Sequence, residues 1–358
     1  MGMIEKSILA SPRIRRFGRT GRCEGGFPLY WSSSGLEMRV RATALEIEID
    51  CSYSGMKPYL SFEVDGLRAQ TFSPLPGAHW YNVFLNLSGE KTHAVRVIKE
   101  TQPFADPADR LRITRFRTDG RLMPLPARRR KIEFIGDSLT SGEGARGPKS
   151  FMEWVPMAFC ASDCYPRVAA DLLRAEYQVV SQSGWGIVCG WDNDPKHNVP
   201  SIYGDVCALT ADGRKPYDFS FQPDTVVIAL GANDINALGQ GAYTDPETGE
   251  VSRLTDSPAD LARVEDAAYR FVASVHEKNP NAKIVWMFFF PESPLSPVVR
   301  AAVERARADA IDARFFAPDA FSRPVRGGTG SRNHPSAVTH RHIARLLAAY
   351  IRESGGNV

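Results

Sequence analysis

One serine of the chain stands in a local sequence that suits a nucleophile. Residues 134–140 read Phe-Ile-Gly-Asp-Ser-Leu-Thr, so that Ser138 directly follows an apolar run. Gly136 lets the backbone turn tightly because it has no Cβ, and a helix that begins here favours developing negative charge at its N-terminus. A serine hydroxyl becomes a useful nucleophile only when a base removes its proton. The turn therefore indicates a catalytic nucleophile only if a second residue of the chain can act as the base.

Three later segments carry the residue types that such a serine needs. They are Ser181 to Gly186 (SQSGWG), Leu230 to Asp234 (LGAND) and Asn333 to Ser336 (NHPS). His334 is the natural general base at neutral pH. Acyl transfer also creates an oxyanion, which backbone N–H groups and side-chain amides stabilise. The second and third segments offer a glycine and an asparagine for this purpose.

The second half of the chain predicts a scaffold that gathers these segments. Apolar strands alternate with helices; we expect strands at 132–135, 178–181, 225–230, 284–290 and 314–317, and helices at 166–176, 258–277, 297–311 and 336–352. This alternation indicates an α/β fold with a parallel sheet covered by helices on both faces. Sites in such folds lie at the carboxyl ends of the strands. All four segments fall at a strand end or just before a helix, so one crevice can hold them.

In type and order, the four segments resemble those of the SGNH/GDSL hydrolase superfamily, over residues 131–352. The resemblance implies a flavodoxin-like, three-layer domain that hydrolyses esters without a cofactor or metal ion. It assigns Ser138 as nucleophile and His334 as base. It further implies an oxyanion hole made by the backbone N–H groups of Ser138 and Gly184 and by the side-chain amide of Asn233.

The sequence departs from this family at one position. Members usually place an aspartate three residues before the histidine, where it orients the imidazole, and here that position holds Ser331. Either a backbone carbonyl or a hydroxyl orients His334, with a carbonyl in the loop 316–333 the expected acceptor, or a carboxylate arrives from elsewhere, with Asp319 the nearest upstream. A Ser–His dyad is the simpler interpretation. We interpret Asp137 and Asp234 as hydrogen-bonding partners of their own turns.

The first half of the chain has a different periodicity. Residues 36–41, 45–50 and 60–65 alternate apolar and polar side chains, and shorter runs follow at 80–87 and 94–98. No amphipathic helix is expected before residue 125, so this half predicts a β-sandwich or jelly roll. The proline-rich stretch 121–128 is interpreted as a linker. We therefore expect a sandwich domain at 1–125 and a hydrolase domain at 126–358.

The two halves together resemble carbohydrate esterase family two, whose acetylxylan esterase-like members join such a sandwich to an SGNH domain. The supporting stretches are 29–35, 64–66 and 183–186. The resemblance implies that the partner is an acetylated carbohydrate, such as xylan or mannan, from which O-acetyl groups are removed. Some members of that family also lack the usual aspartate.

Aromatic residues near the four segments are candidates for binding the substrate. Trp154, Trp185 and Trp191 fall in expected loops, where exposed rings can stack on sugars, although tryptophan is also a core residue. The loop 188–221 is long and is expected to form a lid or a wall of the site. His197 within it has no assigned role, and His340 and His342 in the last helix need none.

Composition excludes several other classes of function. The net charge of +3 is too small to favour nucleic acid or an anionic membrane as partner,, and we interpret the basic clusters at 13–22 and 128–131 as solvated surface or linker. No stretch has the length of a membrane-spanning helix. The N-terminal residues show no apolar signal sequence, and the six cysteines form no CxxC pair, so we expect reduced thiols and a cytoplasmic location. The oligomeric state is left open.

The sequence leaves two alternatives to a carbohydrate O-deacetylase open. A lipid or thioester acylhydrolase should carry an apolar lid, whereas residues 190–200 are rich in Asp, Asn and Lys. The other alternative is a non-catalytic glycan-binding protein whose hydrolase half has decayed. The presence of all four chemistry-bearing segments argues against it, and the missing aspartate keeps it open.

Overall fold

The alternating N-terminal half builds two antiparallel sheets packed face to face. The computed structural model describes residues 2–319, 321 and 326–354. One sheet contains β1 (Ile4–Ser7), β3 (Phe27–Pro28), β5 (Leu45–Ser52), β8 (Gly77–Phe84) and β10 (Arg110–Thr118). The other contains β2 (Ile14–Phe17), β4 (Gly35–Arg41), β6 (Leu60–Val64), β7 (Leu67–Phe72), β9 (His93–Lys99) and β11 (Arg121–Met123). Alternate residues of β4 and β5, such as Met38 and Ile47, are fully buried in the shared core.

The second half contains a five-stranded parallel sheet in the order β13-β12-β14-β17-β18. Its strands are β12 (Arg130–Gly136), β13 (Ala175–Ser181), β14 (Thr225–Ala229), β17 (Lys283–Met287) and β18 (Ala313–Phe316). Taken along the chain, this is the flavodoxin-like order 2-1-3-4-5, whose site lies where the order reverses, between the first and third strands. Here those strands are β12 and β14. The predicted fold class is confirmed.

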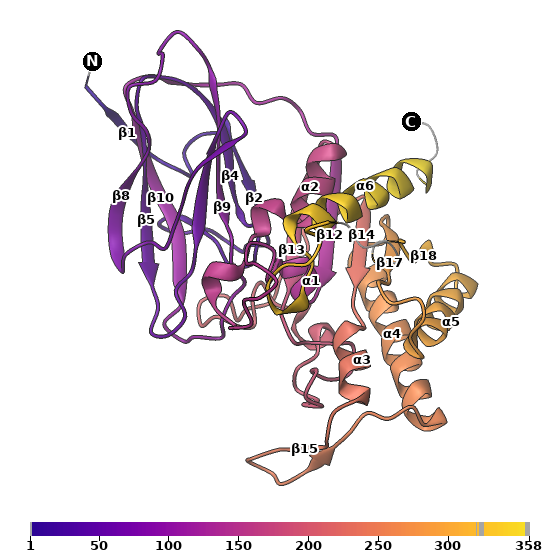
Figure 1. Ribbon diagram of the computed structural model, residues 1–358. Helices are drawn as coiled ribbons and strands as arrows, with labels where there is room; N and C mark the ends of the chain where they lie inside the picture. The colour runs from indigo at the N-terminus through magenta and orange to yellow at the C-terminus, as the bar shows by residue number, and fades with distance from the viewer. Residues whose placement is uncertain (1, 320, 322–325, 355–358) are drawn as a thin grey trace.

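Helices cover both faces of this sheet (Figure 1). They are α1 (Ser138–Ser141), α2 (Tyr165–Leu172), α3 (Ala232–Leu238), α4 (Pro258–Lys278), α5 (Leu295–Ala308) and α6 (Ala337–Ser354). The buried faces of α2 and α6 share one apolar core with the sheet, and α4 and α5 share the other. Short 3-10 turns lie at Pro156–Ala158, Ala161–Asp163, Val199–Ile202 and Ser331–Asn333, and a small hairpin pairs β15 (Tyr243–Thr244) with β16 (Val251–Ser252). No described helix is both long and apolar enough to cross a membrane.

Three predicted boundaries were wrong for local reasons. The helix expected at 166–176 ends at Leu172, and β13 already begins at Ala175, because Arg174 adopts a left-handed φ of 51° that reverses the chain. The strand expected at 284–290 ends at Met287, where its neighbour β18 also ends at Phe316. Residues 121–123 form β11 in the sandwich and are not part of a linker.

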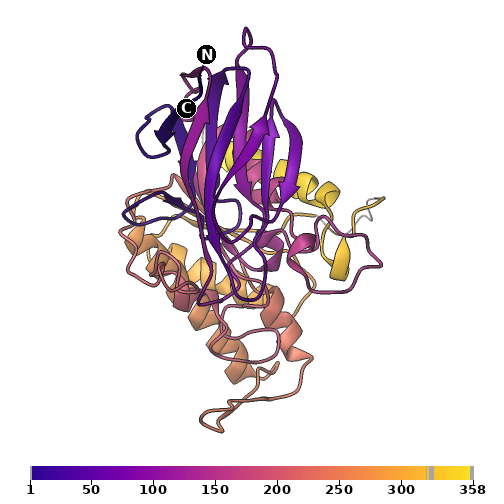
Figure 2. The same ribbon diagram turned by 90° about the vertical axis from the view of Figure 1, so that its left-hand side faces the viewer.

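The sandwich packs directly on the edge of the hydrolase half, where β2 contacts β13. In Figure 2 the sandwich faces the viewer, with helices of the hydrolase half behind and below it. Phe17 of β2 stacks on Tyr177 of β13 with ring centroids 4.8 Å apart. Arg19, which we interpreted as part of a solvated basic cluster, is fully buried and pairs with Glu133 of β12 at 2.8 Å. That interpretation was wrong because the arginine enters a pocket of aromatic rings, including those of Tyr203 and Tyr217.

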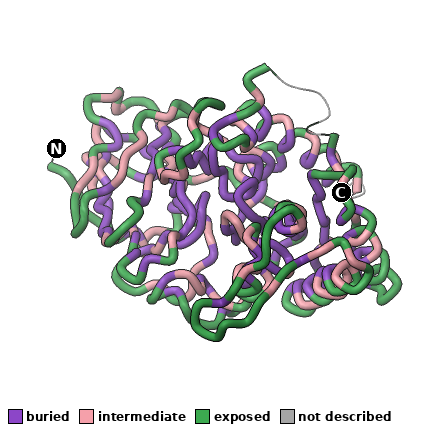
Figure 3. Tube along the Cα trace, turned by 60° about the horizontal axis from the view of Figure 1, so that its bottom comes forward, coloured by how far each residue is buried: buried purple, intermediate pink, exposed green. Residues whose placement is uncertain are grey.

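Buried segments run through the interior of both halves, while exposed segments lie mainly in peripheral loops and on outer helix faces (Figure 3). One buried segment of the sandwich, 99–102, continues past the end of β9 toward the hydrolase half. There Glu100 accepts a hydrogen bond from the backbone N–H of Ser162 at 2.9 Å. This segment brings sandwich residues to the edge of the catalytic sheet.

Candidate active site

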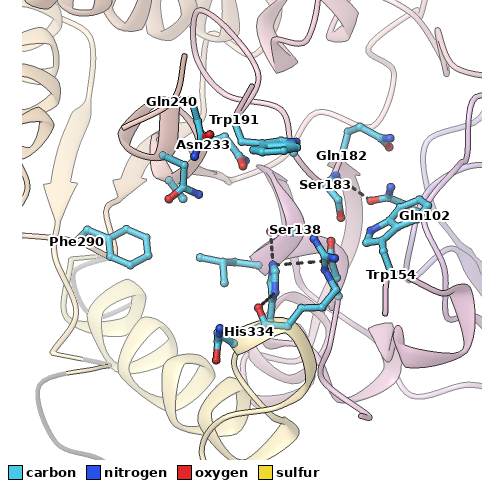
Figure 4. Close-up of a pocket in the computed structure, with 17 residues that line it drawn as sticks. Gln102, Ser138, Trp154, Gln182, Ser183, Trp191, Asn233, Gln240, Phe290 and His334 are labelled. Atoms are coloured by element: carbon cyan, nitrogen blue, oxygen red, sulfur yellow. Dashed lines mark hydrogen bonds and ion pairs between the residues drawn. The ribbon is translucent and has the colours of Figure 1, made fainter. Parts of the chain in front are cut away.

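A cavity of about 710 Å³ opens at the carboxyl ends of β12 and β14 (Figure 4). Ser138 and His334 lie together in it, although they are 196 positions apart, with the serine Oγ 2.8 Å from the histidine Nε2. The lining residues are Gln102, Ser138, Leu139, Glu143, Trp154, Gln182, Ser183, Gly184, Trp191, Ala232, Asn233, Asn236, Gln240, Phe290, Arg332, Asn333 and His334. The distance suits transfer of a proton from the hydroxyl to the imidazole.

The turn between β12 and α1 presents Ser138 to the cavity. The Asp137 side chain accepts a hydrogen bond from the backbone N–H of Leu139 at 3.0 Å and so caps the short helix. A Cβ on Gly136 would lie 2.0 Å from Thr140 Oγ1, so glycine is required by space at this point. Burial raises the pKa of Asp137 to about 7, and the charges of Asp234 and Glu143 act in the same direction. Asp137 therefore serves its own turn and does not contact His334 Nδ1.

A backbone carbonyl occupies the place of the usual triad acid. His334 Nδ1 lies 3.0 Å from the carbonyl oxygen of Arg332, which lies within the loop 316–333. The backbone at this contact is unusual, because Arg332 and the next residue, Asn333, adopt left-handed conformations with φ of 54° and 59°. Asp319, the alternative acid, is exposed. Ser331, at the position of the usual aspartate, donates its backbone N–H to the carbonyl of Gly144 at 3.0 Å.

The three predicted oxyanion donors line the same cavity. Gly184 has a φ of 82°, which favours glycine, and Asn233 lies in the first turn of α3. The Asn233 Nδ2 donates one hydrogen bond to the carbonyl of Trp185 at 2.9 Å, which leaves its second hydrogen for the cavity. Within the described ranges, no protein acceptor binds the backbone N–H of Ser138 or Gly184. These donors suit a tetrahedral intermediate.

The second segment is held in place by a buried carboxylate. Asp234 accepts hydrogen bonds from the backbone N–H groups of Ile187 and Val188, at 2.8 Å and 2.9 Å. Burial raises the pKa of Asp234, and these backbone donors oppose the shift. The aspartate next to the oxyanion asparagine thus supports the loop that carries Gly184.

The structure separates the three candidate tryptophans. Trp154 and Trp191 line the cavity, and Trp191 is half-exposed. Trp185 does not line it, because its ring packs against the core and stacks on His197 with centroids 5.1 Å apart. His197 also faces Asp194 at 3.5 Å. The long loop 188–221 thus contributes Trp191 to the wall of the site, while His197 supports the neighbouring ring.

His340 stays outside the cavity. It is fully buried on α6, next to the ring of Tyr165, and burial lowers its pKa to about 3, so that it is neutral at ordinary pH. In the part of the chain that the structure describes, no group of three or more His, Cys, Asp or Glu residues could hold a metal ion.

Several cavity residues were missed by reasoning from the sequence. Gln102 reaches the site from the sandwich, is fully buried, and accepts a hydrogen bond from the backbone N–H of Ser183 at 2.8 Å. Phe290 lines the cavity because the chain leaves the sheet after Met287. Glu143 follows the nucleophile segment in a turn and is buried beside His334. A charged residue in the glycine-rich stretch 142–147 was the available signal for Glu143, and no local signal marked Gln102.

Comparison with known proteins places this geometry among esterases. Residues 134–342 match the GDSL-like lipase/acylhydrolase family. An acetylxylan esterase/glucomannan deacetylase of Cellvibrio japonicus is 28% identical over 269 residues, which are 74% of this chain and 70% of that protein. The structure of an acetyl xylan esterase from the rumen bacterium Butyrivibrio proteoclasticus superposes with a TM-score of 0.94 at 31% identity, over 99% of both chains. A family two carbohydrate esterase from Clostridium thermocellum, solved with cellohexaose, shares the fold with a TM-score of 0.78 at 23% identity, over 96% of this chain and 99% of that one.

Proposed function

The chain belongs to the GDSL-like lipase/acylhydrolase family and is a carboxylic ester hydrolase, and we propose that its reaction is the removal of O-acetyl groups from a carbohydrate. The single observation that carries the chemistry is the 2.8 Å contact between Ser138 Oγ and His334 Nε2 inside a cavity. The relatives named as acetylxylan esterases support the substrate class, since one of them matches both halves of the chain.

In the proposed reaction, Ser138 Oγ attacks the acetyl carbonyl carbon while His334 Nε2 accepts the hydroxyl proton. The oxyanion receives hydrogen bonds from the backbone N–H groups of Ser138 and Gly184 and from Asn233 Nδ2. The imidazolium then gives its proton to the departing sugar oxygen, which leaves an acetyl-serine. A water molecule, deprotonated by His334, attacks this ester in the same way, and His334 returns the proton to Ser138 Oγ as acetate leaves.

The lining of the cavity supports a polar substrate. Amide side chains of Gln102, Gln182, Asn236 and Gln240 are spread around it, together with the rings of Trp154 and Trp191. Amides can bond sugar hydroxyls, and aromatic faces can pack on sugar rings.

Acetate release from acetylated xylo-oligosaccharides and glucomannan tests the proposal, with Ser138→Ala as the control for the nucleophile. Wild-type protein should release acetate and the variant should not, with an unchanged unfolding temperature. Aryl esters of increasing acyl length give a second measurement, because a pocket fitted to acetate excludes added methylenes. Octanoyl ester cleavage as fast as acetyl cleavage would favour the lipid alternative. Cleavage of aryl acetate with no acetate release from any acetylated sugar would contradict the substrate class.

A further inference from the structure

Glu143 is a buried carboxylate next to the catalytic pair that the proposed reaction does not use. Its side chain is only 4% exposed. Glu143 lies just beyond α1, and its backbone N–H donates a hydrogen bond to the Ser138 carbonyl at 3.1 Å. Its Oε1 is 3.9 Å from His334 Nε2 and 3.0 Å from Arg332 Nε. A carboxylate therefore does lie beside the histidine, on the side facing the serine.

Arg332 connects this carboxylate to the orientation of the histidine. Its guanidinium pairs with Glu143 while its own carbonyl oxygen accepts the hydrogen bond from His334 Nδ1. The carbonyl can point there because Arg332 adopts a left-handed conformation with a φ of 54°, which is unfavourable for any residue with a Cβ,. The backbone N–H of Arg332 is further fixed by the carbonyl of Phe151 at 3.0 Å. The ion pair thus holds an otherwise unfavourable backbone conformation in place.

We propose that Glu143 is a positioning residue that takes over both functions of the absent triad acid. Through Arg332 it fixes the carbonyl that orients His334, and its negative charge offsets the arginine charge when His334 accepts the serine proton. Without Glu143, the Arg332 cation would stand uncompensated beside the developing imidazolium and disfavour it. Without the guanidinium, the carboxylate alone would favour the imidazolium. The inference rests on the proposed roles of Ser138 and His334.

The other titratable groups near the histidine are neutral, paired elsewhere or exposed. His340 approaches from α6 but is buried and neutral, and Asp137 caps α1. The segment that packs against the histidine loop also carries Arg146, which pairs with Glu100 at 3.6 Å, and the exposed residues Lys149 and Glu153. Of the charged groups, Glu143 approaches His334 Nε2 to 3.9 Å, and Arg332 pairs with that carboxylate.

The test is the pH dependence of kcat/KM for 4-nitrophenyl acetate in four variants of the full chain. Glu143→Gln should lower the plateau about tenfold or more and shift the acid limb to lower pH by about one unit. Arg332→Asn, which tolerates the left-handed backbone, should shift the acid limb to higher pH by a similar amount. The double variant should return the limb close to its wild-type position. Glu63→Gln, which removes a charge from the remote buried pair of Glu63 and Arg167, should leave the limb unchanged.

Opposite shifts in the two single variants support the proposal, because a merely structural role would lower activity without moving the limb in opposite directions. Unchanged limbs, or shifts in one common direction, overturn it. If Glu143→Gln lacks a cooperative thermal transition, Arg332→Asn alone decides, since an upward shift supports the proposal and none contradicts it. Ser138→Ala and His334→Ala are run alongside. Activity in Ser138→Ala or His334→Ala would refute the proposed function itself. If both are inactive but Glu143→Gln keeps the wild-type pH profile, only the role of Glu143 is refuted.

Discussion

His334 donates its Nδ1 hydrogen bond to the carbonyl oxygen of Arg332, 3.0 Å away and only two positions earlier in the chain. The acceptor is neutral and belongs to the backbone, so that it fixes the tautomer in which Nε2 is free to accept a proton from Ser138. An aspartate at this place would do the same and would also add a negative charge. The chain therefore separates orientation of the histidine from its electrostatic stabilisation.

Substitution of Asp319 by Asn is expected to leave turnover of acetyl esters within about tenfold of wild type, because the Nδ1 position is already occupied. Removal of a true triad acid costs about 10⁴ in chymotrypsin-like enzymes. Steady-state kcat with an aryl acetate gives the answer directly. A loss of several thousandfold with the fold preserved would show that the acid function resides in Asp319.

Substitution of Asn233 by Ala should lower kcat by about 10² to 10³ while KM changes little, since the amide acts on the oxyanion of the transition state. The variant also removes the hydrogen bond to the Trp185 carbonyl, so its unfolding temperature is measured in parallel. With an aryl acetate as substrate, Asn236→Ala is the matched control, because Asn236 lies on the same helix and lines the same cavity. An equal loss of activity in both variants would argue against a specific role for Asn233.

Gln102 belongs to the sandwich half and lines the active-site cavity, so we expect catalysis to depend on the sandwich. Its Oε1 accepts the Ser183 N–H beside Gly184, so Gln102→Ala should release this loop and reduce kcat/KM about tenfold,. Gln102→Glu keeps an acceptor oxygen at the same reach and should retain more of the activity. Gln240→Ala changes the same residue type on the opposite side of the cavity and should have little effect on hydrolysis of an aryl acetate, which carries no sugar (Figure 4). Equal activity in Gln102→Ala and wild type would show that the loop with Ser183 and Gly184 keeps its conformation without this hydrogen bond.

The elements that position the nucleophile were predictable because their signals are local. The alternating apolar residues of β4, β5 and β6 face the shared core of the sandwich, and the apolar residues at the end of β12 lead to the turn that carries Ser138. The order of the four segments was enough for the fold class, since a parallel sheet brings its carboxyl ends together. The predicted strand at 284–290 failed because the three phenylalanines at 288–290 are apolar whether they lie in a sheet or in a cavity wall.

Residues that act through tertiary contacts could not be found in this way. Gln102 and Ser183 are 81 positions apart, and nothing around Gln102 distinguishes it from a surface glutamine. Arg19 belonged to a basic cluster of the usual solvated composition, yet its partner Glu133 lies on a buried strand 114 positions later. By contrast, a carbonyl acceptor for His334 was expected in the loop 316–333, and the structure identifies it as that of Arg332. The contacts of Gln102 and Arg19 depend on how the two halves pack together.

Asp137 offers a further test, through the pH dependence of stability. The residue is 1% exposed, and burial raises its pKa to about 7 from an ordinary value near 3.8. Between these two pH values the folded protein keeps a proton that the unfolded chain has released. The free energy of unfolding contributed by this group is therefore fully present below about pH 4 and is lost progressively as the pH rises to about 7.

Asp137→Asn cannot ionise and still offers an oxygen to the Leu139 N–H, so it should escape this loss. The difference in unfolding free energy between the variant and wild type should grow in favour of the variant from pH 4 to pH 7 and then level off. Its full size is on the order of a few kcal/mol, since one pKa unit corresponds to about 1.4 kcal/mol. Urea denaturation at several pH values measures it, with Asp256→Asn as an exposed control that should follow wild type. Parallel curves for Asp137→Asn and wild type would mean that the buried carboxyl ionises in the folded protein as readily as in the unfolded chain, and that the backbone donors of its turn fully offset its burial.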